Sequence, residues 1–172
     1  MRGTAPEFSR RVPLAQLGPG IFEQEIEAIA AERDKLAERF GLLALDRLTA
    51  VVKLRRQSGA VVLLDAAFEA EFLQTCVVTL EPVRSAISDR FSLVYGPVEA
   101  GPAADAPVVG DIVFEPLSGD EIDIGEAVAQ ELSLALPDFP RHPDAIIEAA
   151  TAGGPVEGPF SVLAQLRNRE DR

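Results

Sequence analysis

Two long runs of alternating apolar and polar residues, joined by a short turn, constrain the fold of this chain more than any other feature. The first run, residues 45–57, has apolar side chains at every second position: Leu48, Ala50, Val52 and Leu54. After the turn residues Gln57-Ser58-Gly59, the run 60–75 continues the alternation with Val62, Leu64, Ala66, Phe68, Ala70 and Phe72. Side chains two positions apart lie on one face of a strand. The pattern therefore predicts a long antiparallel hairpin, about 45–75, with one buried face.

Two other segments have the spacing of amphipathic helices. Residues 21–40 place apolar side chains three, four and seven positions apart, with Gly41 as a natural end: Phe22, Ile26, Ile29, Leu36 and Phe40. Asp123, followed three residues later by Glu126, is typical of the start of a second helix that runs to about 136. We expect an α+β domain in which an antiparallel sheet, built on the 45–75 hairpin, is packed by helices at about 21–40 and 123–136.

The chain length of 172 residues favours one domain, which we place at residues 1–150. Shorter alternating stretches predict further strands at 7–12, 84–95 and 111–117, and residues 144–150 predict a short helix. Proline, alanine, glycine and acids fill about 96–110, which predicts a mobile acidic surface loop. Residues 151–172 are expected to form a flexible C-terminal tail with a short amphipathic stretch at 159–166.

The sequence also bears on the compartment. Ala60–Leu64 is an apolar run that Asp65 ends, far short of the roughly 20 residues that a membrane-spanning helix needs. Residues 1–12 contain arginines but no apolar core of a signal peptide. The single cysteine cannot form an internal disulfide. These features favour a cytoplasmic protein without a membrane association.

Negative charge is concentrated in one part of the chain. The formal net charge is −12, and residues 91–140 carry ten acids without a lysine or arginine. Such a block would oppose binding to bare nucleic acid and favour a basic partner, although a solvated surface is the alternative reading. The candidate docking residues are Glu115, Asp120, Glu121, Glu126 and Glu131.

A small basic patch on the first hairpin strand is the candidate for RNA contact. It contains Arg47, Lys53, Arg55 and Arg56, with no aromatic residue interleaved for base stacking. Glu69 and Glu71 on the return strand are expected to lie across from these cations and to pair with them.

Counting residues argues against a metal or catalytic centre. Cys76 and His142 are the only cysteine and histidine, so no zinc site can be assembled. A Cys76–His142 nucleophile pair is the enzymatic alternative, yet Cys76 ends an apolar strand, where inert cysteines are common. Glu81 and the acids at 115–123 could hold a divalent cation through oxygen, but their spacing matches no calcium loop, and helix capping accounts for Asp123. We expect no cofactor and no catalytic residue.

Several motifs together resemble a known family. They are Gln74-Thr-Cys-Val-Val-Thr-Leu-Glu-Pro-Val83, Phe114-Glu-Pro-Leu117, Ile122-Asp-Ile-Gly-Glu-Ala-Val-Ala-Gln-Glu-Leu-Ser-Leu-Ala-Leu-Pro137 and Pro159-Phe160-Ser-Val-Leu163. In order and spacing, from about Phe8 to Leu166, the chain resembles the YceD family, and most closely its alphaproteobacterial branch.

The resemblance implies a small protein that supports the accumulation of large-subunit ribosomal RNA, without an established catalytic mechanism. It implies a ribosomal protein or a large-subunit assembly intermediate as partner, with ribosomal RNA contacted directly or indirectly. Many relatives carry C-x-x-C where this chain has Cys76 and Thr79. The departure favours a structural role for Cys76, Glu81 and Pro82, which would close the hairpin and turn the chain under the second helix, whose start is Asp123.

We therefore expect a non-enzymatic ribosome-biogenesis factor that docks a protein. A direct RNA-binding protein that uses the basic hairpin face and an enzyme that depends on Cys76 are the alternatives.

Overall fold

The predicted hairpin forms the centre of the sheet in the computed structural model, which describes residues 6–57, 60–97, 113–117 and 119–145. Strands β3 (Ala44–Arg56) and β4 (Val62–Thr75) pair antiparallel, with Ala50 opposite Phe68 and Leu54 opposite Leu64. The predicted inward residues are all buried, and a bulge between Leu45 and Arg47 shifts the register near the start of β3. The alternation thus predicted both the hairpin and its buried face.

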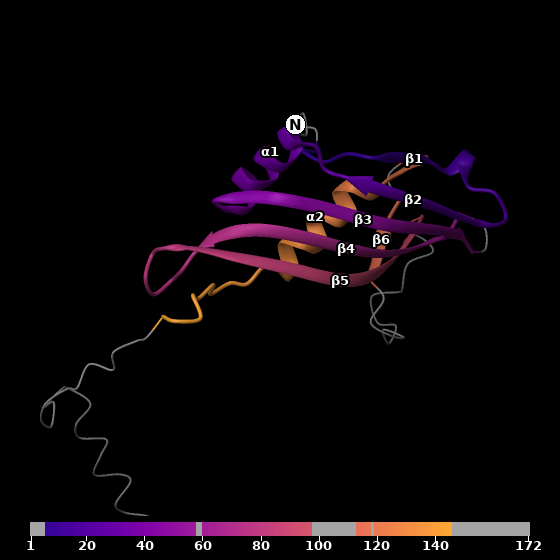
Figure 1. Ribbon diagram of the computed structural model, residues 1–172. Coiled ribbons are helices and arrows are strands. Elements are labelled where there is room, and N and C mark those ends of the chain that lie inside the picture. The colour runs from indigo at the N-terminus through magenta and orange to yellow at the C-terminus, as the bar shows by residue number, and fades with distance from the viewer. Residues whose placement is uncertain (1–5, 58–59, 98–112, 118, 146–172) are drawn as a thin grey trace, which may run out of the picture.

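Three more strands complete a five-stranded sheet with the order β2-β3-β4-β5-β6 (Figure 1). Strand β2 (Ile21–Glu27) pairs antiparallel with β3, and the long β5 (Pro82–Gly96) pairs antiparallel with β4. The short β6 (Val113–Pro116) is parallel to the end of β5, so the sheet is not wholly antiparallel as expected. The α+β class is nevertheless confirmed.

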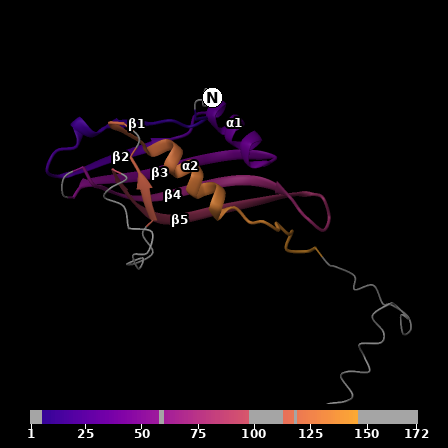
Figure 2. The same ribbon diagram turned by 180° about the vertical axis from the view of Figure 1, so that it is seen from behind.

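Helix α2 (Ile124–Ala135) covers the buried face of the sheet, as the two opposite views show (Figures 1 and 2). Ile124, Val128 and Leu132 are fully buried at this contact. The Asp123 side chain accepts a hydrogen bond from the backbone N–H of Glu126, so the predicted helix start is confirmed. Leu136 ends the helix, one residue before Pro137.

The prediction of one helix over 21–40 was wrong for its first part. Residues Ile21–Glu27 form β2, and only Ala30–Phe40 form helix α1, which ends at Gly41 in the left-handed conformation as expected. Phe22 and Ile26 are four apart, which suits a helix, but both also stand at even positions of an alternating run. Pairing with Leu54 and Ala50 of β3 decides between the two periods in favour of the strand.

A second, two-stranded sheet was not predicted. Strand β1 (Arg11–Pro13) is shorter than the expected strand 7–12 and pairs antiparallel with β7 (Glu121–Asp123), which leads into α2. A short 3-10 turn, Leu14–Gln16, follows β1. Phe8 and Val12 are buried, so the N-terminal segment, residues 6–13, is part of the core. We call this segment the N-terminal arm.

Some predictions lie outside the described residues: the turn residues Ser58 and Gly59, most of the loop 96–110 and of the helix 144–150, and the tail 151–172 with its stretch 159–166. In the described ranges, no helix is long and apolar enough to cross a membrane.

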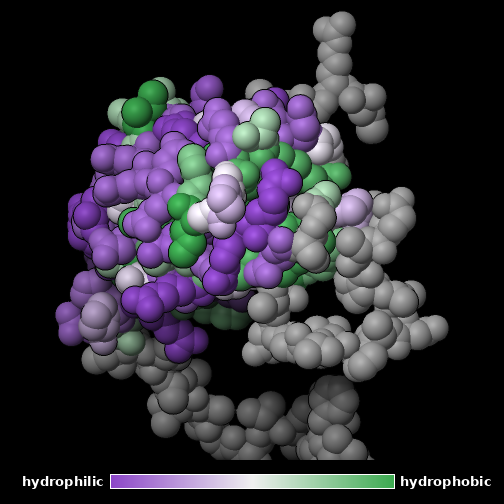
Figure 3. Space-filling view, turned by 90° about the vertical axis from the view of Figure 1, so that its right-hand side faces the viewer, coloured by the Kyte–Doolittle hydropathy of each residue, from purple (hydrophilic) through white to green (hydrophobic). Residues whose placement is uncertain are grey.

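Seen from the right-hand side of Figure 1, hydrophilic residues gather over one side of the molecule and hydrophobic residues over another (Figure 3).

Candidate partner-docking site

The first turn of α2 holds the N-terminal arm in place. The Asp123 carboxylate accepts hydrogen bonds from the Arg10 backbone N–H at 2.8 Å and from the Ser9 hydroxyl at 2.5 Å, in addition to capping its own helix at Glu126. The Ile124 N–H donates to the Arg10 carbonyl at 3.0 Å. Asp123 is therefore a structural residue, as its predicted role implies, but it also binds a segment more than a hundred residues away.

Gly125 lets the arm approach the helix closely. A Cβ atom at this position would lie 2.6 Å from the carbonyl oxygen of Phe8 and 3.0 Å from the backbone nitrogen of Arg10. Both are backbone atoms, so a side chain could be accommodated only by moving the arm. The glycine of the Ile-Asp-Ile-Gly-Glu motif is thus required by packing against residues near the chain's start.

Glu126 completes this contact through an arginine of α1. Arg39 donates two hydrogen bonds to the Glu126 carboxylate, at 2.9 and 3.0 Å, and a third to Glu7 at 2.9 Å. The hydrogen bond to Glu126 is the main cause of a pKa of Arg39 that is raised above its ordinary value. Glu126, a predicted docking residue, is therefore engaged within the molecule.

Two other predicted docking residues lie near the same end of the molecule. Glu121 is within 3.6 Å of Arg11 across the β1–β7 pair, and the exposed Asp120 accepts a backbone hydrogen bond from Leu14 through its carbonyl. The five predicted residues do not form one acidic face. Three of them, Asp120, Glu121 and Glu126, lie where the N-terminal segment and α1 pack against β7 and the first turn of α2.

The remaining two are Glu115, which lies on β6 opposite Tyr95 of β5, and Glu131, which lies in the second half of α2. Glu131 is partly buried, and its pKa is raised by that burial and then by the negative charges of Asp89 and Glu115. Burial, followed by the charges of Glu115, Asp123 and Glu131, raises the pKa of Tyr95 to about 12. Among the described residues, Asp89, Glu115 and Glu131 make no salt bridge with a lysine or arginine. We call these three residues the acidic cluster.

Asp89 was missed by the sequence analysis, although the sequence contains a signal for it. The register puts Ile87, Asp89 and Phe91 on the α2-facing side of β5, opposite Ala70, Phe68 and Ala66. A carboxylate at a position where the alternation calls for an apolar side chain indicates a site that is not ordinary core.

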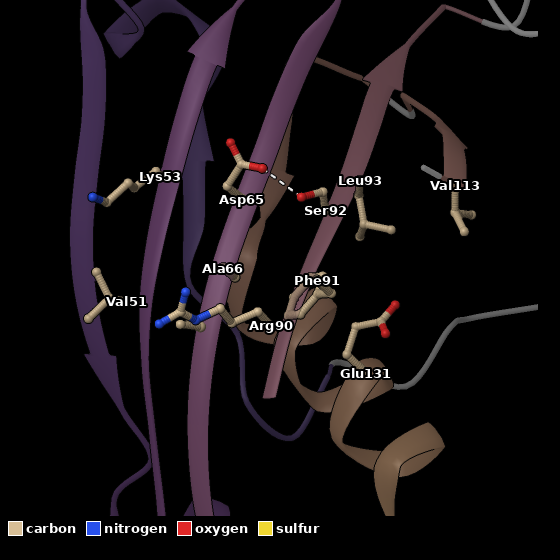
Figure 4. A pocket seen from close by; sticks show the side chains of 11 residues that line it. Val51, Lys53, Asp65, Ala66, Arg90, Phe91, Ser92, Leu93, Val113 and Glu131 are labelled. Atoms are coloured by element: carbon tan, nitrogen blue, oxygen red, sulfur yellow. Dashed lines mark hydrogen bonds between the residues drawn. The ribbon is translucent and has the colours of Figure 1, made fainter. Parts of the chain in front are cut away.

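A hollow of about 760 Å³ adjoins the acidic cluster. Glu131, Val113, Phe91 and Leu93 line it on one side of β5, and Arg90, Ser92 and Asp65 line it on the outer face of the sheet. Figure 4 shows Glu131 and Val113 beyond β5, with Arg90 extending across β4 toward Val51. Carboxylates next to apolar side chains and an open strand can bind a basic segment.

The turn between β4 and β5 is built around Cys76, which has no exposed surface. Its Sγ accepts hydrogen bonds from the backbone N–H groups of Val78 and Thr79, both at 3.4 Å, and of His142 at 3.3 Å. The Thr79 hydroxyl is the main cause, and the His142 N–H the next, of a thiol pKa that is lowered to about 6 in spite of burial. The sulfur thus ties the turn to the segment that follows α2.

Comparison with known families identifies the chain. The family described as Large ribosomal RNA subunit accumulation protein YceD matches residues 64–167. The chain belongs to the YceD family. The family description connects it with the accumulation of large-subunit ribosomal RNA, as the resemblance implied. No curated protein and no solved structure is similar enough to match the chain.

In this YceD chain, the geometry around Cys76 does not assemble a nucleophile and a base. The backbone N–H of His142, not its imidazole, contacts the sulfur. The imidazole Nδ1 instead accepts a hydrogen bond from the Asp144 N–H at 3.2 Å. The Thr79 hydroxyl donates a hydrogen bond to the sulfur.

Glu81 and Pro82 end the same turn. The Glu81 carbonyl accepts a hydrogen bond from the Cys76 N–H at 2.8 Å, and Pro82 begins β5 opposite Thr75. In the described ranges no group of acids, cysteine and histidine is placed to hold a metal ion.

Three of the four predicted RNA-contact residues in this YceD chain pair with carboxylates on neighbouring strands. Arg47 contacts Glu69 at 2.5 Å and Glu71 at 3.2 Å, which confirms the expected pairing. Lys53 lies 3.3 Å from Glu23, and Arg55 lies 3.9 Å from Asp65. Arg56 donates to the Leu14 carbonyl at 2.7 Å. The predicted RNA-contact residues are therefore interleaved with acids and do not form a purely basic surface.

Proposed function

We propose that this YceD-family chain is a non-enzymatic, cytoplasmic ribosome-biogenesis factor that supports large-subunit ribosomal RNA by docking a protein. The partner is a basic ribosomal protein or a large-subunit assembly intermediate, and ribosomal RNA is bound only through it. The observation that carries the proposal is the acidic cluster of Asp89, Glu115 and Glu131, which lies beside the hollow along β5.

The unfavourable electrostatic free energy of the Glu131 charge supports a docking role for the acidic cluster. Burial and then the like charges of Asp89 and Glu115 raise the pKa of Glu131, so the charged form of Glu131 destabilises the free protein. A lysine or arginine from a partner would remove that cost on binding and gain charge-assisted hydrogen bonds. Some acids elsewhere on the molecule, such as Glu126 and Glu69, already have such partners within the chain.

The pairing of the outer-face cations argues against direct RNA binding. To neutralise phosphates, Arg47, Lys53 and Arg55 would first have to leave their carboxylates, and those carboxylates would then repel the RNA. A protein partner requires no such rearrangement of the outer face.

The test is a pull-down of tagged protein from cell lysate, divided into two halves of which one is treated with ribonuclease. Large-subunit ribosomal proteins should remain bound in both halves, and raising the salt concentration should weaken their recovery. Recovery of ribosomal RNA alone, lost completely after ribonuclease treatment, would show that the chain binds RNA directly. The residues to substitute would then be Arg47, Lys53, Arg55 and Arg56.

A further inference from the structure

In the part of the chain that the structure describes, the outer edge of β5 is unpaired over most of its length. Strand β4 pairs with β5 from Pro82 to Tyr95, whereas β6 adjoins it only from Leu93 to Gly96. Figure 2 shows β6 as a short arrow beside β5. Within the described residues, no strand pairs with the far side of β5 from Pro82 to Ser92. An open edge of this kind presents backbone N–H and C=O groups that can pair with another chain.

The acidic cluster lies beside this open edge and on one side of it. Asp89 faces the α2 side of β5, and Glu131 approaches from α2 itself. The half-buried Phe91 and the exposed Val113 provide apolar surface next to them in the same hollow. A chain bound along the β5 edge could therefore form backbone hydrogen bonds, ion pairs and apolar contacts at the same time.

We propose that the open edge of β5, from Pro82 to Ser92, binds an extended basic segment of a protein partner, which joins the sheet as an additional strand. This inference rests on the proposed docking function and names the place and the manner of binding. Backbone hydrogen bonds to β5 hold the segment, and its side chains alternate between the two faces of the sheet.

The alternation sets the pattern of the segment. Side chains on the α2 side meet Asp89, Glu131 and Phe91, so lysine, arginine and apolar residues suit this row. The alternate side chains of the bound segment would contact Arg90 and Ser92 on the outer face of the sheet. Arg90 disfavours further cations there, so small or hydroxyl side chains suit these positions. A single carboxylate often protects an edge strand against pairing, but two of one sign on one side, Asp89 and Glu131, select basic partners.

The opposite edge of the sheet, β2, differs from β5 and supplies the control. Arg10 donates to the Glu27 carbonyl at 3.0 Å, so the N-terminal arm already bonds to the end of β2. Glu25 and Glu27 are exposed on this edge strand, and they are matched in number to the two cluster residues Asp89 and Glu131.

The test measures binding of a fluorescent synthetic peptide to the full chain by anisotropy at low salt. In the probe, threonine alternates with lysine or valine, so that lysines and valines share one face of a strand. We expect saturable binding that weakens about tenfold or more in the double variant Asp89→Asn, Glu131→Gln. The double variant Glu25→Gln, Glu27→Gln changes the net charge equally and should bind as the unsubstituted protein does.

Two control peptides separate strand addition from simple charge attraction. One has the same composition but consecutive lysines, and the other is the probe methylated at every second backbone nitrogen. Both should bind at least about tenfold more weakly than the probe, because they lose the alternation or the backbone hydrogen bonds. Equal binding of all three peptides, or equal weakening by the two double variants, would overturn the proposal.

Two further results would assign the edge to another occupant and also overturn the proposal. One is a dimer of the full chain, seen by sedimentation, that the Asp89→Asn, Glu131→Gln pair weakens. The other is tighter binding of a peptide with the sequence of residues 159–166 than of the probe.

The peptide experiment and the pull-down test strand addition and protein docking separately. Absent peptide binding, with ribosomal proteins still recovered after ribonuclease treatment, would refute strand addition and leave protein docking in place. Ribosomal proteins that are not recovered would refute the docking function, whatever the peptide does.

Discussion

The two ends of helix α2 both carry glutamates, but the surroundings of these glutamates differ. At the first turn, Glu126 receives two hydrogen bonds from Arg39, and Asp123 receives two from the N-terminal arm and one from its own helix. Near the other end, the partly buried Glu131 lies near the like charges of Asp89 and Glu115. The same helix therefore presents one acidic group that stabilises the fold and one that costs it stability.

The difference shows that the number of charges in a segment does not define a docking surface. The block 91–140 contains ten acids, yet Glu121, Asp123 and Glu126 contact cations or backbone donors of the N-terminal segment and α1. Only carboxylates that the fold leaves without a compensating partner have free energy to gain from a ligand. This argument removes Glu121 and Glu126 from the docking candidates, and of the others Glu115 and Glu131 lie together with Asp89 near β5.

The largest effect on stability is expected where the N-terminal arm packs against the first turn of α2. Gly125→Ala should lower the free energy of unfolding by about 2–3 kcal/mol, because the new methyl group would meet the Phe8 carbonyl at 2.6 Å. Urea denaturation measures the change. Gly20→Ala is the control, since nothing lies within 4 Å of a Cβ there, and it should change stability by less than about 0.5 kcal/mol. Equal effects at the two glycines would mean that the arm does not pack on α2 as described.

The comparison between the two glutamates can be tested with one kind of substitution. Glu126→Gln should destabilise the protein by about 1 kcal/mol, because it weakens the paired hydrogen bonds from Arg39. Glu131→Gln should leave stability unchanged or raise it slightly, because it removes a disfavoured charge. Urea midpoints at neutral pH measure both. A loss of the same size at both positions would contradict the contrast drawn here.

The pH dependence of Glu131 gives a smaller effect with a definite sign. Its pKa in the folded protein is raised above the ordinary value of 4.5, so the folded state binds more protons than the unfolded state between those two values. As pH rises through this window, the unsubstituted protein should lose stability relative to Glu131→Gln. The difference in Tm between the two proteins from pH 4 to pH 7 measures it, and a difference that does not change with pH would argue against the raised pKa.

Cys76 should show the opposite sign, because its sulfur is surrounded by donors. Its pKa is lowered from 9.0 to about 6, so the contribution of the thiolate is complete above pH 9 and is lost as pH falls through about 6. The Tm of the unsubstituted protein should therefore rise relative to Cys76→Ala between pH 6 and pH 9. Because the side chain has no exposed surface, alkylation of the native thiol should remain slow throughout. Fast alkylation of the folded protein would contradict this account and favour a reactive cysteine.

The sequence predicted the parts of the fold that depend on neighbours along the chain. The hairpin could be predicted because a period of two over β3 and β4 fixes both the strand and its buried face. The cap at Asp123 and the end of α1 at Gly41 are likewise local. Ile21–Glu27 was misassigned because Phe22 and Ile26 fit both periods, and pairing with β3 settles the ambiguity.

The site depends on contacts between distant residues, which no local pattern contains. Arg39 and Glu126 are 87 positions apart, and Arg10 and Asp123 are 113 apart. The number of acids can be read from the sequence, but which of them pair with distant residues cannot be predicted from it. Asp89 is the exception, since its position in an alternating strand marks it as unusual from the sequence alone.

The most direct test of the account is complementation in cells depleted of this protein, with the ratio of large-subunit to small-subunit ribosomal RNA as the measurement. The unsubstituted protein and the Glu25→Gln, Glu27→Gln variant should restore the ratio. The Asp89→Asn, Glu131→Gln variant should fail to restore it, although its abundance and Tm equal those of the unsubstituted protein. Full restoration of the ratio by that variant would show that the acidic cluster beside β5 is not the site through which the protein acts.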